Sequence, residues 1–264
     1  MRKLSRKSAI VLGLGTVALA APALATHSWS NYHWARTSSE LTIPVGDNVS
    51  AVWDSYLTKA VADWNQSTVI NSPKVAGSTN PKNCRAVAGT IQACNSTYGN
   101  NGWLGLASIS LSGGHITQGT TKVNDTYYNT PTYNTPAWRA AVMCQEIGHD
   151  YGLAHQDENS ATDLTNSCMD YTNVPAGNES PDAHDYQQLL LIYNHLESAA
   201  MATFGGTGAG STAEVGDTPD SWGRATGFDR QGRPNVFERI DGPGRKTVTH
   251  ITWAIGQGPR NFRR

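Results

Sequence analysis

One short run of the chain, residues 145–155 (QEIGHDYGLAH), combines residue types that suit metal-assisted hydrolysis. Gln145 and His149 are four residues apart, so on a helix their side chains share one face and can reach one ion. Glu146 is offset by one residue, beside that ion, where it can act on a bound water. Gly152 permits the left-handed backbone that ends a helix and turns His155 back toward the ion. A zinc-bound water beside a carboxylate is a known hydrolytic arrangement.

The run resembles the H-E-x-x-H-x-x-G-x-x-H motif of the metzincin clan of zinc endopeptidases, with Gln145 in place of the first His. Residues 167–171 (SCMDY) are similar to the Met-turn of that clan, and Met169 follows His155 by fourteen residues. Residues 185–190 (DYQQLL) are similar to the final helix of matrixins. The resemblance implies an α+β fold in which a mixed twisted sheet accompanies an active-site helix, a Met-turn and a C-terminal helix.

The same resemblance implies a secreted zinc-dependent endopeptidase that cleaves protein or peptide substrates. Glu146 would be the general base on a zinc-activated water, and Gln145, His149 and His155 would hold the Zn²⁺. Tyr171 lies two residues after the Met. In the astacin and serralysin branches, a Tyr at that offset reaches the metal or the oxyanion, so Tyr171 is the second candidate catalytic residue.

The amide at position 145 leaves three interpretations open, because zinc prefers imidazole nitrogen and thiolate sulfur to an amide oxygen. The site is a weakened Gln-His-His centre, or another group replaces Gln145, or the chain has lost its metal. The replacement candidates are Asp157, Tyr171 and, more distant in sequence, His184. The remaining histidines show no ligand spacing and are expected to be structural: His27, His33, His115, His195 and His250.

Two alternative functions fit the same residues. One is a catalytically inactive, secreted binding protein on a metzincin fold. The other is an envelope-associated structural protein in which the C-terminal part matters more than the cleft.

The first 25 residues predict a secretory signal peptide. Four basic residues precede an apolar run over 9–21, and Ala23-Leu24-Ala25 forms a small-x-small cleavage pattern. The apolar run is too short for a membrane span. Four cysteines in a secreted chain predict two disulfides with three possible pairings. We favour Cys84–Cys94, which closes the Gly- and Ala-rich loop over 85–93, and this leaves Cys144–Cys168. The second bond would hold the active-site helix against the segment around Met169.

Charge divides the mature chain unevenly. Residues 26–220 carry 7 basic and 18 acidic residues, a net charge of −11, whereas residues 221–264 carry 9 basic and 3 acidic residues, a net charge of +6. The acidic part argues against nucleic acid as a ligand. The basic part is expected to lie on the acidic domain, to touch an anionic envelope or to have no partner, and the protein is expected to be a monomer.

The resemblance implies a metzincin-like catalytic domain over 40–202, after an N-terminal segment over 26–39. The glycines among small residues predict a flexible linker over 203–220, and the charge marks 221–264 as a basic C-terminal tail. Hydrophobic periodicity predicts the elements. An amphipathic helix is predicted over 49–65, an active-site helix over 138–151 and a C-terminal helix over 183–202. Strands are predicted over 40–45, 69–76, 103–110 and 116–124. Two further strands, over 236–240 and 246–255, are predicted to pair with each other. Residues 80–101 and 124–136 are predicted to be loops.

Overall fold

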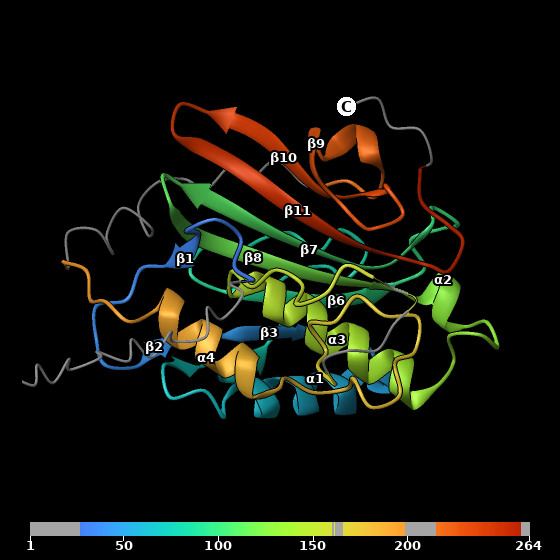
Figure 1. Ribbon diagram of the computed structural model, residues 1–264, viewed down its shortest axis with the longest axis horizontal. Coiled ribbons are helices and arrows are strands. Elements are labelled where there is room, and N and C mark those ends of the chain that lie inside the picture. The colour runs from blue at the N-terminus through green and yellow to red at the C-terminus, as the bar shows by residue number, and fades with distance from the viewer. Residues whose placement is uncertain (1–26, 160, 162–165, 199–214, 260–264) are drawn as a thin grey trace, which may run out of the picture.

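The computed structural model describes residues 27–159, 161, 166–198 and 215–259. They form an α+β fold around one mixed sheet of nine strands (Figure 1). Along the sheet the strand order is β5-β3-β6-β8-β7-β11-β10-β9, and β1 pairs with β8. The strands are β1 (His33–Trp34), β3 (Val45–Asn48), β5 (Lys74–Ala76), β6 (Ile91–Ser96), β7 (Trp103–Ser112), β8 (His115–Asn124), β9 (Arg224–Phe228), β10 (Pro234–Gly242) and β11 (Arg245–Trp253).

The helices lie on one side of this sheet (Figure 1). They are α1 (Ala51–Trp64), α2 (Asp125–Tyr128), α3 (Pro136–Asp150) and α4 (Ala183–Ile192). A 3₁₀ turn, η1 (Pro219–Ser221), lies apart from them beside β9 (Figure 1). A small second sheet joins β2 (Leu41–Thr42) to β4 (Ile70–Asn71). The main core lies between α1, α3 and the sheet, and Trp53, Trp64 and Ile147 are fully buried in it.

The sequence places α3 by clear local signals at both ends. Thr135 caps its N-terminus by accepting a hydrogen bond from the backbone N–H of Trp138 (3.2 Å), and Pro136 occupies the first turn. Gly152 follows the helix with φ +94°, and a β-carbon there would lie 2.4 Å from the carbonyl oxygen of Tyr32. A glycine is therefore required where the chain turns back toward His155, as predicted.

Both favoured disulfides are confirmed. Cys84 is bonded to Cys94, and Cys144 is bonded to Cys168. The second bond links α3, one residue before Gln145, to the segment just before Met169. The Met169 side chain is buried against Gly148 of α3.

The prediction of a loop over 80–101 was wrong in its second half. Strand β6 lies there, between β3 and β8, and pairs in parallel with both. Its sequence (IQACNS) lacks the apolar pattern of an interior strand. Gln92 and Asn95 are polar but buried, and they form hydrogen bonds inside the fold. The predicted loop over 124–136 also contains a short helix, α2. Helix α4 ends at Ile192, short of the predicted residue 202.

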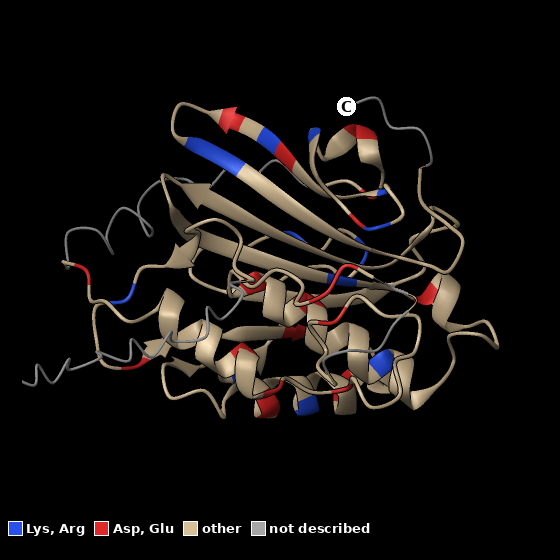
Figure 2. Cartoon of the chain, in the orientation of Figure 1, with Lys and Arg blue, Asp and Glu red and all other residues tan. Residues whose placement is uncertain are grey.

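The chain after residue 220 continues the main sheet. Strands β10 and β11 form the predicted hairpin, and β11 pairs antiparallel with β7 from Arg245 opposite Ser112 to Trp253 opposite Trp103. Figure 2 shows charges of both signs along β10 and basic residues at the start of β11. The segment also contacts the acidic part of the chain directly, since Asn235 donates to the Glu158 carboxylate (2.9 Å).

In the portion of the chain that the structure describes, no helix is long and apolar enough to cross a bilayer. The predicted signal peptide over 1–25 lies outside the described residues, and so does most of the Gly-rich stretch over 203–220.

Candidate metal centre

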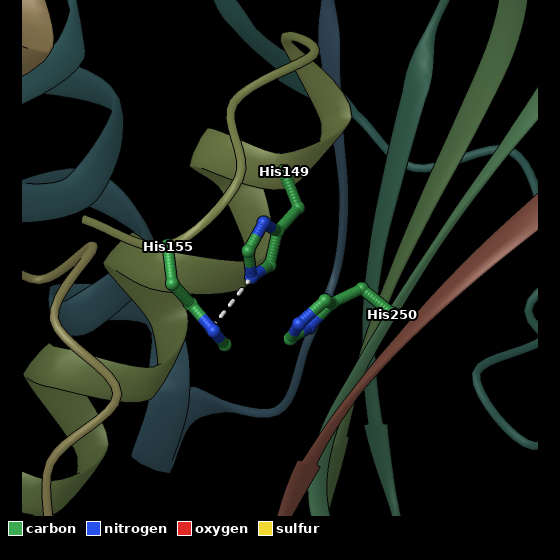
Figure 3. Close-up of side chains that lie close together, drawn as sticks. All are labelled: His149, His155 and His250. Carbon is green, nitrogen blue, oxygen red and sulfur yellow. Dashed lines mark hydrogen bonds between the residues drawn. The ribbon is translucent and has the colours of Figure 1, made fainter. Parts of the chain in front are cut away.

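Three buried imidazoles meet between α3 and the sheet (Figure 3). His149 comes from the last turn of α3, His155 from the segment after Gly152, and His250 from the middle of β11. The Nε2 atoms of His149 and His155 are 3.2 Å apart. One ligand atom from each of the three rings lies within 4.8 Å of the others. The predicted residues His149 and His155 therefore come together, and a third imidazole joins them.

The two predicted histidines are oriented so that their Nε2 atoms can bind a cation. His149 Nδ1 lies 2.8 Å from the carbonyl oxygen of Leu153, and His155 Nδ1 lies 3.1 Å from a Glu158 carboxylate oxygen. Because each Nδ1 faces one of these acceptors, the two Nε2 atoms are turned toward each other and are the nitrogens available to a shared cation. Zinc bonds of 2.0–2.1 Å in a tetrahedron put neighbouring nitrogens about 3.3 Å apart, so the observed separation fits a zinc ion shared by both rings.

His250 is the residue that sequence analysis missed, since it was expected to be structural. Among the described residues, neither of its ring nitrogens has a hydrogen-bond partner, although both are buried. Its ring centroid lies 3.8 Å from that of His149 and 4.3 Å from that of His155. Burial lowers the pKa of His250 well below its usual value, and the His149 and His155 rings lower it further. A neutral, buried imidazole with unpaired nitrogens has the donor chemistry of a third zinc ligand.

Gln145 lies beside this cluster, and the structure pairs both ends of its amide with other groups. Its Oε1 accepts a hydrogen bond from the Thr252 hydroxyl (2.7 Å), and its Nε2 donates to the backbone carbonyl of Asp170 (3.1 Å). The amide therefore joins α3 to β11 on one side and to the segment around Met169 on the other. His250 of the cluster lies on β11, the same strand whose Thr252 hydroxyl donates to Gln145.

Glu146 is fully buried beneath β7. A β-carbon added to Gly105 of that strand would lie 2.3 Å from Glu146 Oε1, so the glycine makes room for the carboxylate. Burial raises the pKa of Glu146 well above its usual value, and the nearby Thr252 hydroxyl partly offsets this effect. A carboxyl whose pKa is raised by burial can exchange a proton with a reacting group near neutral pH.

The other predicted candidates have different surroundings. The Tyr171 ring stacks on His155 at 4.9 Å, but its hydroxyl accepts from Arg233 (3.2 Å) and from the backbone of Trp253 (3.3 Å). The backbones of Asp157 and Asp170 form an isolated parallel β-bridge. The Asp157 carboxylate accepts a hydrogen bond from the backbone N–H of Asn159. His184 lies on α4, with its ring against that of His27.

Two elements enclose the cluster. Trp29 stacks on His149 with a centroid distance of 5.2 Å. Strand β11, which carries His250, lies next to β7 in the sheet. All three histidines and Glu146 are buried. A cavity that reaches Gln145 has a volume of about 20 Å³, room for about one water and not for a peptide side chain; its lining includes Trp138, Val142 and Tyr171.

No protein-family model and no curated protein sequence matches the chain. Among solved structures it is similar to high choriolytic enzyme 1, a hatching enzyme zinc-protease from Oryzias latipes (medaka fish), with 16% identity and a TM-score of 0.35 over 63% of this chain and 96% of that one. It is also similar to myroilysin, with 13% identity and a TM-score of 0.35 over 64% of this chain and 99% of that one. Similarity at this level assigns the chain to no family and to no activity.

Proposed function

We propose that the chain is a secreted, zinc-dependent endopeptidase in which His149 and His155 hold the metal and Glu146 is the general base. One observation carries the proposal: the Nε2 atoms of two buried imidazoles lie 3.2 Å apart, and one ligand atom of a third buried imidazole lies within 4.8 Å of them. Two nitrogen lone pairs at that distance repel each other unless a proton or a cation lies between them. The two disulfides are consistent with an oxidising compartment.

Zinc bound there would polarise the scissile carbonyl and make a water reactive at neutral pH. Glu146 would accept the proton that the attacking water loses and return it to the leaving amine. Leu153 and Glu158 would hold the two imidazoles in the binding tautomer through their Nδ1 atoms. The disulfide before Gln145 would keep α3 in place over Met169.

We further propose that the third metal ligand depends on the position of β11. With β11 in place, His250 supplies the third nitrogen, and Thr252 engages the Gln145 oxygen. If β11 left β7, His250 and Thr252 would leave together, and the amide oxygen of Gln145 would be free to take the ligand position that its spacing predicts. Tyr171 would be freed from Trp253 in the same step.

Substrate access also depends on β11. Extended peptides bind proteases and other receptors by adding a strand to an exposed sheet edge, and β7 would offer such an edge next to the imidazoles. In the structure β11 occupies that edge along its whole length. Hydrolysis would therefore require a form in which β11 has moved away from β7. In the structure β11 is in place, and this edge of β7 is closed to substrate.

The closure favours a second candidate function, a zinc-binding protein without turnover. Three buried imidazoles beside a cavity of only about 20 Å³ could hold an ion without leaving room there for a peptide.

One experiment separates the two functions. A site-specific protease sequence would be inserted within residues 205–214, and the purified mature chain would be assayed for zinc content and casein hydrolysis before and after cutting. For a peptidase we expect one zinc at this centre, no hydrolysis by the intact chain, and hydrolysis after cutting and release of the hairpin. Glu146→Ala should abolish that hydrolysis and leave the zinc in place. Zinc binding with no hydrolysis in the released form, shown to be folded by circular dichroism, would support the non-catalytic alternative.

A further inference from the structure

A second group of metal-binding side chains lies away from the first centre. It consists of His33 on β1, His115 at the start of β8, and His195 and Glu197 in the segment after α4. The Glu197 Oε1 atom lies 2.6 Å from His115 Nε2, 3.0 Å from His33 Nε2 and 3.6 Å from His195 Nε2. Three imidazoles thus surround one carboxylate oxygen, and none of the four residues belongs to the site of Glu146.

The fold brings these residues together by two separate backbone pairings. His33 and His115 are direct partners in the parallel β1–β8 ladder, so their side chains leave the same face of the sheet. The backbone N–H of Glu197 donates to the carbonyl oxygen of Arg36 (2.8 Å), which fixes the segment after α4 beside β1. The group therefore joins three parts of the chain that are distant in sequence.

Two of the nitrogen atoms are spaced as they would be around a shared cation. His33 Nδ1 faces the carbonyl oxygen of Asn31 at 2.6 Å, so Nε2 is the ring nitrogen that points toward Glu197 and His195. The Nε2 atoms of His33 and His195 are then 3.3 Å apart. This matches the separation of about 3.3 Å between neighbouring nitrogens in a tetrahedral zinc site.

Charge and access also suit a cation. In the described part of the chain, the second oxygen of Glu197 is buried and has no hydrogen-bond partner. The carboxylate itself is only 12% exposed, whereas His195 is 46% exposed. A cavity of about 430 Å³, lined in part by His33 and His195, opens beside the group and offers a route for an ion.

We propose that His33, His115, His195 and Glu197 form a second divalent-metal site that binds zinc. Three imidazoles and one carboxylate supply four donors, the usual coordination number of zinc, and imidazole nitrogen and carboxylate oxygen are both zinc ligands. Bound metal would tie the N-terminal segment and the chain after α4 to the end of β8. The competing explanation is an ion pair between Glu197 and a protonated histidine, which needs no metal.

The test is the zinc content of the full mature chain after equilibrium dialysis against buffered free Zn²⁺ at pH 7.5. His115→Ala and Glu197→Gln should each hold one zinc fewer per chain than the wild type. His184→Ala and Glu179→Gln are matched controls, because they remove a histidine and a carboxylate outside the group, and they should retain the wild-type content. Added Zn²⁺ should raise the Tm of the wild type more than that of His115→Ala.

Cobalt gives an independent measure that does not depend on the first centre. The difference between the Co²⁺ absorption spectra of the wild type and Glu197→Gln should show the visible bands of one tetrahedral nitrogen- and oxygen-bound ion. Equal zinc contents in the wild type, His115→Ala and Glu197→Gln would overturn the proposal. A Glu197→Gln protein that loses stability at equal metal content would show the ion pair instead. Because the readout is a difference in metal content, it holds whether or not the chain is a peptidase.

Discussion

Gln145 and Thr252 are joined across the closed site by a hydrogen bond of 2.7 Å between the Thr252 hydroxyl and the Gln145 amide oxygen. The residue that departs from the metzincin pattern therefore contacts the strand that covers the site. An amide suits this position because one end accepts from β11 while the other donates to the backbone of Asp170. The structure thus offers a physical reason for Gln at 145: it attaches the C-terminal hairpin to α3.

Thr252→Val should loosen this attachment. The change keeps the shape of the side chain but leaves the buried Gln145 oxygen without its donor, which should lower the free energy of unfolding by about 1–2 kcal/mol. Urea unfolding checks the stability, and amide hydrogen exchange should show faster exchange in β11. Thr120→Val is the control, since the Thr120 hydroxyl is buried without a partner among the described residues. Equal losses in both variants would contradict the assigned role of Thr252.

His250→Ala should weaken zinc binding at the first centre. Mutation of a residue that only hydrogen-bonds a metal ligand typically lowers metal affinity 10–100-fold. His250 would be a direct ligand, so its loss should raise the Kd for zinc at least about 100-fold. Competition with a chromophoric chelator measures this, with His184→Ala as the histidine control. An unchanged Kd in a folded His250→Ala protein would leave Gln145 or Tyr171 as the third ligand.

The local parts of this centre could be predicted from sequence. The spacing of Glu146, His149 and His155 and the turn at Gly152 depend on residues within one helix and the segment that follows it. Such short-range patterns follow directly from helical geometry. The same holds for α1, whose apolar residues repeat at the helical period.

The long-range parts could not be predicted. His250 lies 95 residues after His155 and reaches it only because β11 pairs with β7, and no spacing rule encodes a strand pairing of that range. His33 and His115 likewise depend on the β1–β8 ladder. Strand β6 was missed because it is central yet polar, and buried amides replace the apolar residues that normally identify an interior strand.

The disulfide at Cys144 should matter for the metal as well as for stability. Cys144→Ala/Cys168→Ala should lower the free energy of unfolding by about 3 kcal/mol and weaken zinc binding, because the bond holds α3 next to the ligands. Cys84→Ala/Cys94→Ala should cost a similar amount of stability and leave zinc affinity unchanged, since that bond lies away from the centre. Denaturant titration and the chelator competition separate the two effects. Equal zinc affinities in the two double variants would show that the Cys144 bond is not needed for the ligand geometry.

Asp185 should make stability depend on pH. Burial raises the pKa of Asp185 to about 6, against the hydrogen bonds from Ser167, Asp182 and Gln156 that favour its charged form. His27 faces it at 3.5 Å, and burial lowers the pKa of His27 to about 4, so the histidine is neutral over most of this range. The folded state binds the Asp185 proton more tightly than the unfolded state does, so the contribution of this group to stability falls as pH rises from about 4 through 6.

Asp185→Asn removes that dependence. The stability of the variant relative to the wild type should rise between pH 4 and pH 7 by up to about 3 kcal/mol, the equivalent of two pKa units. Urea unfolding at half-unit pH steps measures the difference, and taking the difference cancels groups common to both proteins. A stability difference that stays constant over this range would mean that Asp185 is ionised in the folded protein throughout.

Gly105→Ala tests whether the place of the Glu146 carboxylate matters for hydrolysis. The added methyl group would lie 2.3 Å from Glu146 Oε1 and 2.6 Å from Val142 Cγ1, so the carboxylate has to move. We expect hydrolysis by the released form to fall at least tenfold, in the range that a displaced general base costs, while zinc content stays at the wild-type level because no histidine is touched. Gly114→Ala is the matched control, since its nearest neighbour would be the Asn31 side chain at 3.5 Å, an ordinary contact. If Gly105→Ala kept full activity, Glu146 would tolerate displacement, and its assignment as the base would lose its geometric support.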